Sequence, residues 1–331
     1  MSLLFSASVF PFAGVAGETF AVDSRQISNF KVTSEQSTFG SLEFVGGLVM
    51  NSDNAQFGAL SSIRFRPDGR HFVGVLDTGH WMTGAIERDS EGRLLGLSSV
   101  EISPMVGEGG STEKTKWLVD AEGLALRDGE IVVGFEQRHR VDVYPDAGFE
   151  TSPPLRSVPF LIPAGELRRN GGFETVVVAP TSSPLAGAVL VVAERSVDPD
   201  GNFLAAILEG PLKGRFTLKR RDRYDATDAA FLPNGDLLLL ERRFELSTGI
   251  GMRIRRIKGS SIRPGAVVDG EVLLEAGFGA QIDNMEGLDV VVGTDGTPHI
   301  IITSDDNHSI LERSLMLEFR LNEVDAKSTT N

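Results

Sequence analysis

Apolar runs of strand length alternate with turns along most of the chain. A short motif that contains an acidic residue precedes several of these runs, and we call it the acidic phrase. Residues 120–124 read Asp-Ala-Glu-Gly-Leu, and residues 225–229 and 283–288 repeat this order of acidic, small and apolar positions. A fainter copy surrounds Glu174, and an earlier member at 58–62 lacks the first acid. After each phrase, an apolar run ends in or leads to another acidic residue. These second acids are Asp77, Glu136, Glu194, Glu241 and Asp305.

The spacing of the phrases predicts the fold. From Glu122 through Glu174 and Asp228 to Glu286, the steps are 52, 54 and 58 residues. Several short strands per unit at this period are typical of propeller blades rather than of helical or leucine-rich repeats. We therefore predict an all-β protein with a β-propeller fold. Five repeats are visible and the strands that close the ring suggest one more, so the expected number of blades is six.

Turn and strand patterns support a closed ring. The last strong strand, residues 314–321, alternates as a half-buried strand does, and residues 42–49 are its natural partner. Pairing the two ends in one blade would leave no open edge at the seam. Tight hairpins favour Asp-Gly and Asn-Gly because their turns need positive φ. Such dipeptides occur at 68–69, 128–129, 234–235, 269–270 and 295–296.

The chain is expected to form one domain, residues 25–324, between a leader or N-terminal extension at 1–24 and a disordered tail at 325–331. Residues 1–17 are apolar and rich in small side chains, but no Lys or Arg precedes the apolar run. An atypical export leader and a simple N-terminal strand both fit this pattern. A periplasmic or extracellular location is expected, and a cytoplasmic one stays open. No stretch of 18 uninterrupted apolar residues follows, so no membrane span is predicted.

Composition narrows the function. Hydrophobic residues make up 41% of the 331 positions, which is enough for a core, and 37 glycines and 15 prolines supply turns. The net charge of −14 argues against binding of nucleic acid or an anionic membrane, because both need a positive surface, and such a chain attracts cations. Disulfides, zinc–thiolate sites and cysteine nucleophiles are excluded because the chain has no cysteine.

If every blade starts its innermost strand at the same end of the ring, the repeated acids converge around one central opening. Carboxylates gathered there stay charged only with cations or hydrogen-bond donors among them. Arginines follow several of the acids, and Arg138, Arg195 and Arg242 are candidates to bind a substrate. Calcium is the second candidate partner, because it takes six to eight oxygen ligands. The expected calcium ligands are Asp283, Glu286, Asp305, Asp306 and Asn307. Acids at matching repeat positions also serve as purely structural ion pairs, so both interpretations stay open.

Several phrases in fixed order together resemble a known family. These include Phe-Val-Gly-Gly-Leu at 44–48, Asp-Ala-Glu-Gly-Leu at 120–124, Asn-Met-Glu-Gly-Leu at 284–288 and Ser-Asp-Asp-Asn at 304–307. They resemble the bacterial phytase-like family, described as "esterase-like activity of phytase", from about Leu42 to Leu321. The resemblance implies a β-propeller domain that is usually exported, with an enzymatic label that is itself inferred.

Two functions of different classes are consistent with these features. As an enzyme, the protein would be a metal-assisted hydrolase of phosphate or carboxylate esters, acting on a small anionic ester at the acidic opening. As a binding module, the same ring would hold calcium, another cation or a small polar ligand without chemistry. For the enzyme, the candidate catalytic residues are Glu122, Glu136, Glu286, Asp305 and His308. His308 is included because a histidine can act as general acid or base near neutral pH.

Overall fold

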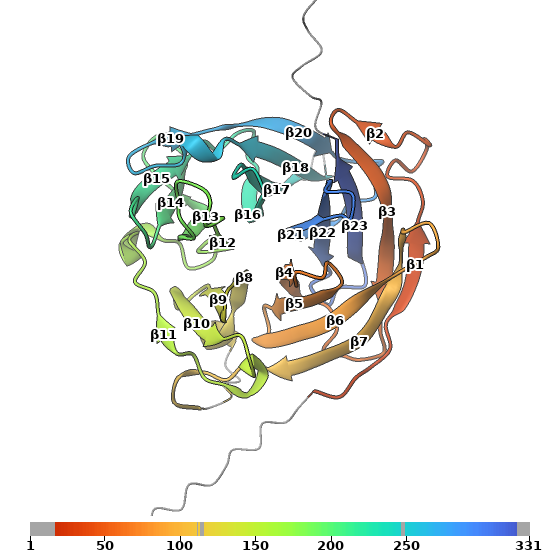
Figure 1. Cartoon of the computed structure of the whole chain (residues 1–331), viewed down its shortest axis with the longest axis horizontal. Coiled ribbons are helices and arrows are strands. Elements are labelled where there is room, and N and C mark those ends of the chain that lie inside the picture. The colour runs from red at the N-terminus through yellow and green to blue at the C-terminus, as the bar shows by residue number, and fades with distance from the viewer. Residues whose placement is uncertain (1–16, 111, 113–115, 246–248, 323–331) are drawn as a thin grey trace, which may run out of the picture.

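The computed structural model describes residues 17–110, 112, 116–245 and 249–322, and it shows five β-sheets arranged as blades around a central axis (Figure 1). The expected tail and residues 1–16 of the expected leader lie outside the described residues. The prediction of an all-β propeller is confirmed, whereas the predicted number of six blades is wrong. No helix in the described part of the chain is long and apolar enough to cross a membrane.

Two of the sheets are consecutive four-stranded meanders. The first contains β4 (Leu60–Phe65), β5 (His71–Leu76), β6 (His80–Arg88) and β7 (Leu94–Pro104). The second contains β8 (Ala121–Arg127), β9 (Glu130–Phe135), β10 (Arg140–Pro145) and β11 (Arg156–Ser157).

The third and fourth blades follow in sequence, and one short strand from the chain segment of the fourth blade joins the third. The third contains β12 (Thr175–Val178), β13 (Val189–Val197), β14 (Phe203–Ile207), β15 (Gly214–Leu218) and, parallel to β15, β19 (Val267–Val268). The fourth contains β16 (Asp225–Phe231), β17 (Leu237–Glu245), β18 (Gly249–Ile257) and β20 (Gly270–Ala276). Because β19 lies between β18 and β20 in the chain, it ties the outer edges of these two blades together.

The fifth blade combines both ends of the described chain. It contains β21 (Asn284–Val292), β22 (Pro298–Asp305), β23 (Ser314–Leu321), β3 (Leu42–Asn51) and β1 (Asp23–Ile27), and β2 (Thr38–Phe39) also pairs with β3. The few helical turns are α1 (Lys116–Val119) and the 3-10 turns η1 (Glu108–Gly110), η2 (Phe149–Thr151), η3 (Ala164–Glu166) and η4 (Gly259–Ser261).

The blade count differs from the prediction because the two terminal strands do not form a blade of their own. β23 pairs antiparallel with β3, with Leu317 opposite Gly47, and both continue the sheet that the last acidic phrase begins. The five phrases therefore each start one blade, and the terminal strands are the outer strands of the fifth. β1 begins at Asp23, two residues before the expected domain boundary.

A β-bulge occurs at the same place in four of the five innermost strands. The unpaired residue is Ser61 in β4, Glu122 in β8, Thr227 in β16 and Glu286 in β21. A bulge adds one residue to one strand and changes the direction of its side chain. The repeated phrase therefore encodes a bulge, and in two blades the bulged residue is an acid.

Apolar side chains pack between neighbouring sheets and fix the ring. Between the fourth and fifth blades, for example, Leu240 and Ile254 pack in one cluster with Leu288, Leu317 and Phe319. The innermost strands contact one another in a ring, in the order β4, β8, β12, β16 and β21. Each begins where the second strand of its blade ends. We call this end of the propeller the acidic face.

Candidate functional site

Seven carboxylates gather at the acidic face, around the axis. We call them the central acid cluster: Asp120, Glu122, Glu136, Glu174, Glu194, Glu286 and Asp305. Within the described residues, carboxylate oxygens of Asp120, Glu122 and Glu136 lie within 4.8 Å of one another, and so do those of Glu136, Glu174 and Glu194. Glu136 belongs to both groups and is therefore the centre of the cluster.

Local structure explains how residues distant in sequence meet here. Glu122 and Glu286 are the bulged residues at the start of two innermost strands. Glu136 directly follows β9, and Asp305 ends β22. Because the start of each innermost strand pairs with the end of the second strand, both kinds of acid reach the same end of the axis. All but the half-buried Glu122 are at least 90% buried.

Few donors compensate the negative charge of the cluster. One oxygen of Glu136 accepts hydrogen bonds from the backbone N–H groups of Gly171 and Gly172, the latter at 3.0 Å. The guanidinium of Arg242 lies 3.2 Å from Glu194 and 3.1 Å from Glu286. Arg242 also donates to the side-chain oxygen of Asn284 at 2.6 Å.

Two further contacts lie at the margin of the cluster. Arg195 lies 3.0 Å from Glu194 but is shared with Asp225, to which its Nε donates at 2.8 Å. The side-chain amide of Gln137 donates to Asp120. The side-chain amide of Asn284 donates to Glu286 at 3.0 Å. Among the described residues, the carboxylates of the cluster therefore outnumber the guanidinium groups that contact them.

The pKa values of the acids reflect this excess. Burial, together with neighbouring carboxylates, raises the pKa of Glu122 and of Glu174 well above the usual range. Burial raises the pKa of Glu286 to about 8, although Arg242 acts to lower it. Burial likewise raises the pKa of Asp305 to about 7, with Asp77 and Asp306 adding to the effect. Without a cation, several of these acids therefore hold protons near neutral pH.

Two histidines lie at the acidic face, His139 just after β9 and His80 at the start of β6, and burial disfavours the charged form of both. Burial lowers the pKa of His139, although Glu136 acts to raise it, and its ring packs edge-on against Phe173. Its Nδ1 is buried without a hydrogen-bond partner. Burial also lowers the pKa of His80, whose Nδ1 lies 3.0 Å from the carbonyl oxygen of Thr78. Both rings can accept a proton near neutral pH.

The structure brings together four of the five predicted catalytic residues. Glu122, Glu136, Glu286 and Asp305 belong to the central acid cluster. His308 does not: it is exposed, in the turn after β22, with positive φ, and its N–H donates to Asp306. Residues 306–308 are three consecutive polar residues because the chain turns here, after the apolar strand β22.

The predicted arginines differ in their positions. Arg242 reaches into the cluster, and Arg195 lies at its edge with a side chain that is 40% exposed. Arg138 is exposed on the loop between β9 and β10, and its carbonyl oxygen accepts a hydrogen bond from Arg140. Of the three, only Arg242 is mostly buried among the acids.

The predicted calcium ligands are partly engaged in other contacts. Asp283 pairs with Arg313 at 3.1 Å. Asp306 accepts hydrogen bonds from the His308 N–H and the Ser314 hydroxyl, and the amide of exposed Asn307 donates to Glu312. Within the described residues, the groups of converging acids are instead those around Glu136.

Sequence reasoning left Asp120, Glu174 and Glu194 out of the candidate set, although all three stand in the repeated phrases. The signal that would have identified them is the repeat itself, since each occupies a phrase start or a strand end. Which copies point to the axis depends on bulges and loop paths, and these are tertiary features.

Asp228 does not lie in the central acid cluster, although its place in the repeated phrase predicts that it converges there with Glu122 and Glu286. The bulge in β16 falls at Thr227, so Asp228 aligns with the glycine after Glu122 and not with Glu122 itself. Its fully buried carboxylate pairs with Arg64 through two hydrogen bonds of 2.7 Å. Arg64 also donates to the carbonyl oxygens of Val176, Ala229 and Leu288. This pair joins four innermost strands across the axis, below the acid cluster.

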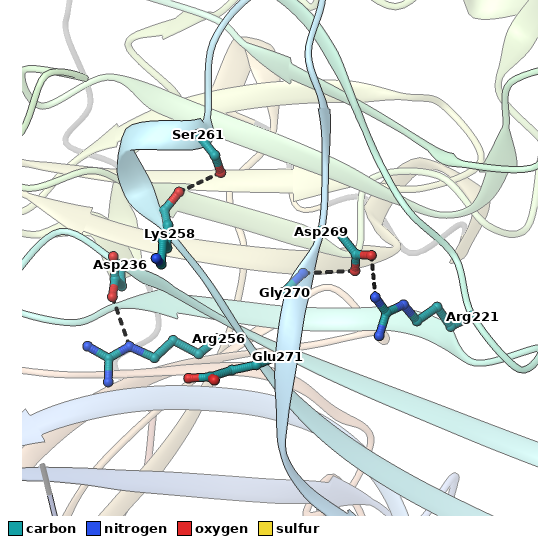
Figure 2. A pocket seen from close by; sticks show the side chains of 8 residues that line it. All are labelled: Arg221, Asp236, Arg256, Lys258, Ser261, Asp269, Gly270 and Glu271. Atoms are coloured by element: carbon teal, nitrogen blue, oxygen red, sulfur yellow. Dashed lines mark hydrogen bonds and ion pairs between the residues drawn. The ribbon is translucent and has the colours of Figure 1, made fainter. Parts of the chain in front are cut away.

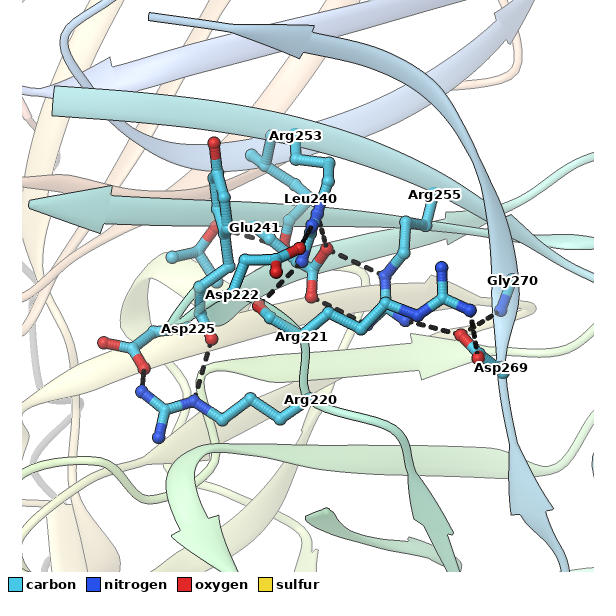
Figure 3. A network of polar contacts seen from close by, with 12 residues as sticks. Arg220, Arg221, Asp222, Asp225, Leu240, Glu241, Arg253, Arg255, Asp269 and Gly270 are labelled. Carbon is cyan, nitrogen blue, oxygen red and sulfur yellow. Dashed lines mark hydrogen bonds and ion pairs between the residues drawn. The ribbon is translucent and has the colours of Figure 1, made fainter. Parts of the chain in front are cut away.

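Glu241, another acid of the repeat, has a structural role. Its buried carboxylate lies between Arg253 and Arg255, with Nε–O distances of 2.8 Å to each (Figure 3). Asp222 and Asp269 bind the outer sides of these arginines. The network links β17 and β18 to the neighbouring blade and is separate from the acid cluster.

Several cavities of the described chain lie outside the acid cluster, and two of them are near the axis or at a blade boundary. One, of about 580 Å³, opens at the rim of the third and fourth blades and is lined by charged residues of both signs (Figure 2). Its Arg221 and Arg256 are paired with Asp269 and Asp236, respectively. Another, of about 370 Å³, lies at the opposite end of the axis, on the far side of Arg64. The paired charges at the rim give no preference for a ligand, so the acid cluster is the better candidate site.

Among solved structures, the chain is similar to the β-propeller domain of Cps50 (Swd1) from Myceliophteria thermophila, with 12% identity, a TM-score of 0.37 and coverage of 76% of this chain and 64% of that one, less than two thirds of its length. It is also similar to the PQQ-bound form of aldose sugar dehydrogenase from Streptomyces coelicolor, with 12% identity, a TM-score of 0.46 and coverage of 86% and 99%.

No curated protein matches the chain. A sequence profile described as "Phytase-like: Esterase-like activity of phytase" matches residues 55–308, which include every acid of the central cluster. Because this match covers most of the chain, the protein belongs to the phytase-like family.

Proposed function

We propose that the protein is a calcium-assisted hydrolase of phosphate or carboxylate esters, with its site at the central acid cluster. The observation that carries this proposal is the convergence of two groups of three carboxylates on Glu136. Carboxylates that outnumber the guanidinium groups of the described residues around them form a cluster that protons or a cation would stabilise. Family membership adds an association with ester hydrolysis, and this is support by analogy alone.

The donor set fits calcium. All the converging ligands are carboxylate oxygens, which are hard donors, and the chain has no cysteine thiolate to compete with them. Glu136, together with Asp120, Glu122, Glu174 and Glu194, would hold the ion. A bound calcium ion supplies a Lewis acid that polarises an ester oxygen and lowers the pKa of an attacking water.

The chain's own residues would bind the substrate and move protons. A phosphate ester needs positive partners in this negative surrounding, and Arg195, whose side chain is 40% exposed, would take a phosphate oxygen. His139 is neutral because burial lowers its pKa, so its ring can accept a proton beside Glu136. Arg242 would hold Glu194 and Glu286 in place.

The proposal is tested with the Glu136→Gln variant. Calcium should raise the melting temperature of the wild-type protein, because a ligand that binds only the folded state stabilises it by about 2.7 kcal/mol at 100 times its Kd. Glu136→Gln should lose this shift, and kcat/KM on a panel of phosphomonoesters and short-chain esters should fall by about 100-fold or more. Differential scanning fluorimetry and a chelator-controlled activity assay measure the two effects.

The matched control is Glu130→Gln, at the other end of the same strand, where the carboxylate pairs with Arg127 away from the cluster. It should keep both the calcium shift and the activity. The hydrolase proposal fails if the wild-type protein, supplied with calcium, hydrolyses no member of the panel.

A second function, a non-catalytic calcium-binding module, rests on the same acid cluster. It is favoured by the depth of the site, since six of the seven acids are at least 90% buried. A calcium-dependent rise in melting temperature without turnover would identify this function. Absence of both effects would exclude both functions.

A further inference from the structure

Large apolar side chains protrude from the acidic face. Among the exposed large hydrophobic residues of the described chain, the four most exposed are Ile310, Phe278, Leu311 and Phe244, at 101%, 100%, 87% and 72%. All four lie where strands end or loops cross at this face, on the fourth and fifth blades. Single exposed apolar residues are ordinary, but a concentration at one end of a molecule marks an interaction surface.

The contacts between these loops show that the residues form one region. Phe244 of β17 pairs with Ile250 of β18. Gly277, the residue before Phe278, packs close to the same position: a Cβ atom built on it would lie 3.7 Å from the Ile250 carbonyl oxygen. Next to Phe278, the carbonyl oxygen of Gly279 accepts a 2.9 Å hydrogen bond from the N–H of Val32, which is also exposed.

The loop that carries Ile310 and Leu311 is fastened to the same region. Arg313 donates to Asp283, to the side-chain oxygen of Gln281 and to the carbonyl oxygen of Ile282, at 2.8 to 3.1 Å. We call the region the apolar rim: Val32, Phe244, Phe278, Ile310 and Leu311. It adjoins the central acid cluster, because the loop with Ile310 begins directly after Asp305.

The shape and charge of the region restrict its partner. Side chains at or near full exposure are protrusions, so they fit a soft apolar layer better than they fit a groove-bound chain. The net charge of −14 opposes association with a second copy or with an anionic membrane. The outermost group of a phosphatidylcholine headgroup is a cation, which complements the acidic face, and the acyl layer beneath it accepts apolar side chains.

We propose that the apolar rim docks the protein onto the surface of a zwitterionic lipid bilayer, with the acidic face turned toward the headgroups. Phe278, Ile310 and Leu311 enter the boundary between headgroups and acyl chains, and the acid cluster lies above them, facing the same surface. The proposal concerns attachment and depends neither on calcium binding nor on hydrolysis.

The test is co-sedimentation with phosphatidylcholine vesicles. The wild-type protein should bind, and the triple variant Phe278→Ser/Ile310→Ser/Leu311→Ser should lower the partition coefficient by at least about 100-fold, since each apolar side chain that enters the interface contributes about tenfold or more. The matched control is Leu155→Ser/Val292→Ser, which replaces two exposed apolar residues at the opposite end of the strands, one on the connection between β10 and β11 and one at the end of β21. The control variant should bind as the wild type does.

A second measurement does not depend on the triple variant being folded. Ile310→Trp should show a blue-shifted emission when vesicles are added, whereas Val292→Trp should not. The proposal is overturned if the wild-type protein does not bind these vesicles, or if the control variant loses binding equally. It is also overturned if the rim substitutions abolish a concentration-dependent self-association instead, because the partner would then be a second copy.

Discussion

At the scale of single residues, a one-position shift separates a candidate ligand from a structural ion pair. Glu122 and Asp228 stand at similar places in their phrases, but the bulges fall at Glu122 and at Thr227. Successive residues of a strand point to opposite faces, so this shift sends Asp228 to Arg64. Burial raises the pKa of Asp228 although Arg64 acts to lower it, and Asp228 in turn acts to raise the pKa of Arg64.

Asp228→Asn should therefore destabilise the protein strongly. The substitution leaves Arg64 buried with its charge uncompensated, which costs about 3–5 kcal/mol of unfolding free energy. Asp146→Asn is the control, because Asp146 pairs with Arg66 where both side chains are about one-quarter to one-third exposed. That pair should contribute less than about 1 kcal/mol. Urea denaturation of both variants measures the difference, and equal losses would show that the axial pair has no special role.

At the scale of elements, close approach of the innermost strands decides where the acids lie. A Cβ built on Gly123 of β8 would lie 2.7 Å from the carbonyl oxygen of Glu174, just before β12. A Cβ on Gly287 of β21 would similarly lie 3.3 Å from the Cγ2 atom of Ile63, in β4 of the neighbouring blade. Glycine after the bulged acid thus permits the packing that brings acids of adjacent blades together.

Gly123→Ala should separate β8 from β12. The crowding should lower the unfolding free energy by about 1–3 kcal/mol, and calcium should then stabilise the variant less than it stabilises the wild type. Gly165→Ala is the control, since no atom lies within 4 Å of its added Cβ. Denaturant melts with and without calcium check both effects. A neutral Gly123→Ala would mean that the strands can relax apart without cost.

At the scale of the whole molecule, the propeller has two unlike ends divided by the Arg64–Asp228 pair. One end holds the central acid cluster and the apolar rim. The other end holds the cavity of about 370 Å³, which Asp289 helps to line. Burial raises the pKa of Asp289 to about 6. The cluster and the rim together make the acidic face the functional end in our interpretation.

The stability of the calcium-free protein should fall as pH rises from about 4.5 to 8. Glu286 has a pKa raised from 4.5 to about 8 and Asp305 one raised from 3.8 to about 7, so between these values the folded state binds more protons than the unfolded chain. The unfolding free energy then decreases with increasing pH, and the whole penalty is present above pH 8.

Calorimetry in chelator at pH 5.5 and pH 8 measures this dependence. Added calcium should restore more stability at pH 8 than at pH 5.5, because the proposed ligands Glu122 and Glu174 also have raised pKa values and protons compete with the ion for their oxygens. Glu286→Gln should flatten the pH profile. A stability that rises between pH 5.5 and pH 8 in chelator would contradict the assignment of these pKa values.

The sequence by itself determined the class of fold and the identity of most of the acids in the cluster. A repeat of acid, turn and apolar run specifies strands locally, and its period of 52 to 58 residues specifies blades. It also determined the strands 42–49 and 314–321, which pair in the fifth blade. These features follow from patterns along the chain, which local propensity and alternation are sufficient to encode.

Only the tertiary structure decided the number of blades and the membership of the acid cluster. Residues 314–321 have the same alternating pattern whether they add a blade or complete one, because alternation does not specify which strand lies beside them. Glu174, Glu194 and Asp228 are all acids of the repeat, yet the first two converge with Glu136 and the third pairs with Arg64. Bulges and the close packing of neighbouring blades make this selection, since both depend on contacts between residues far apart in the chain.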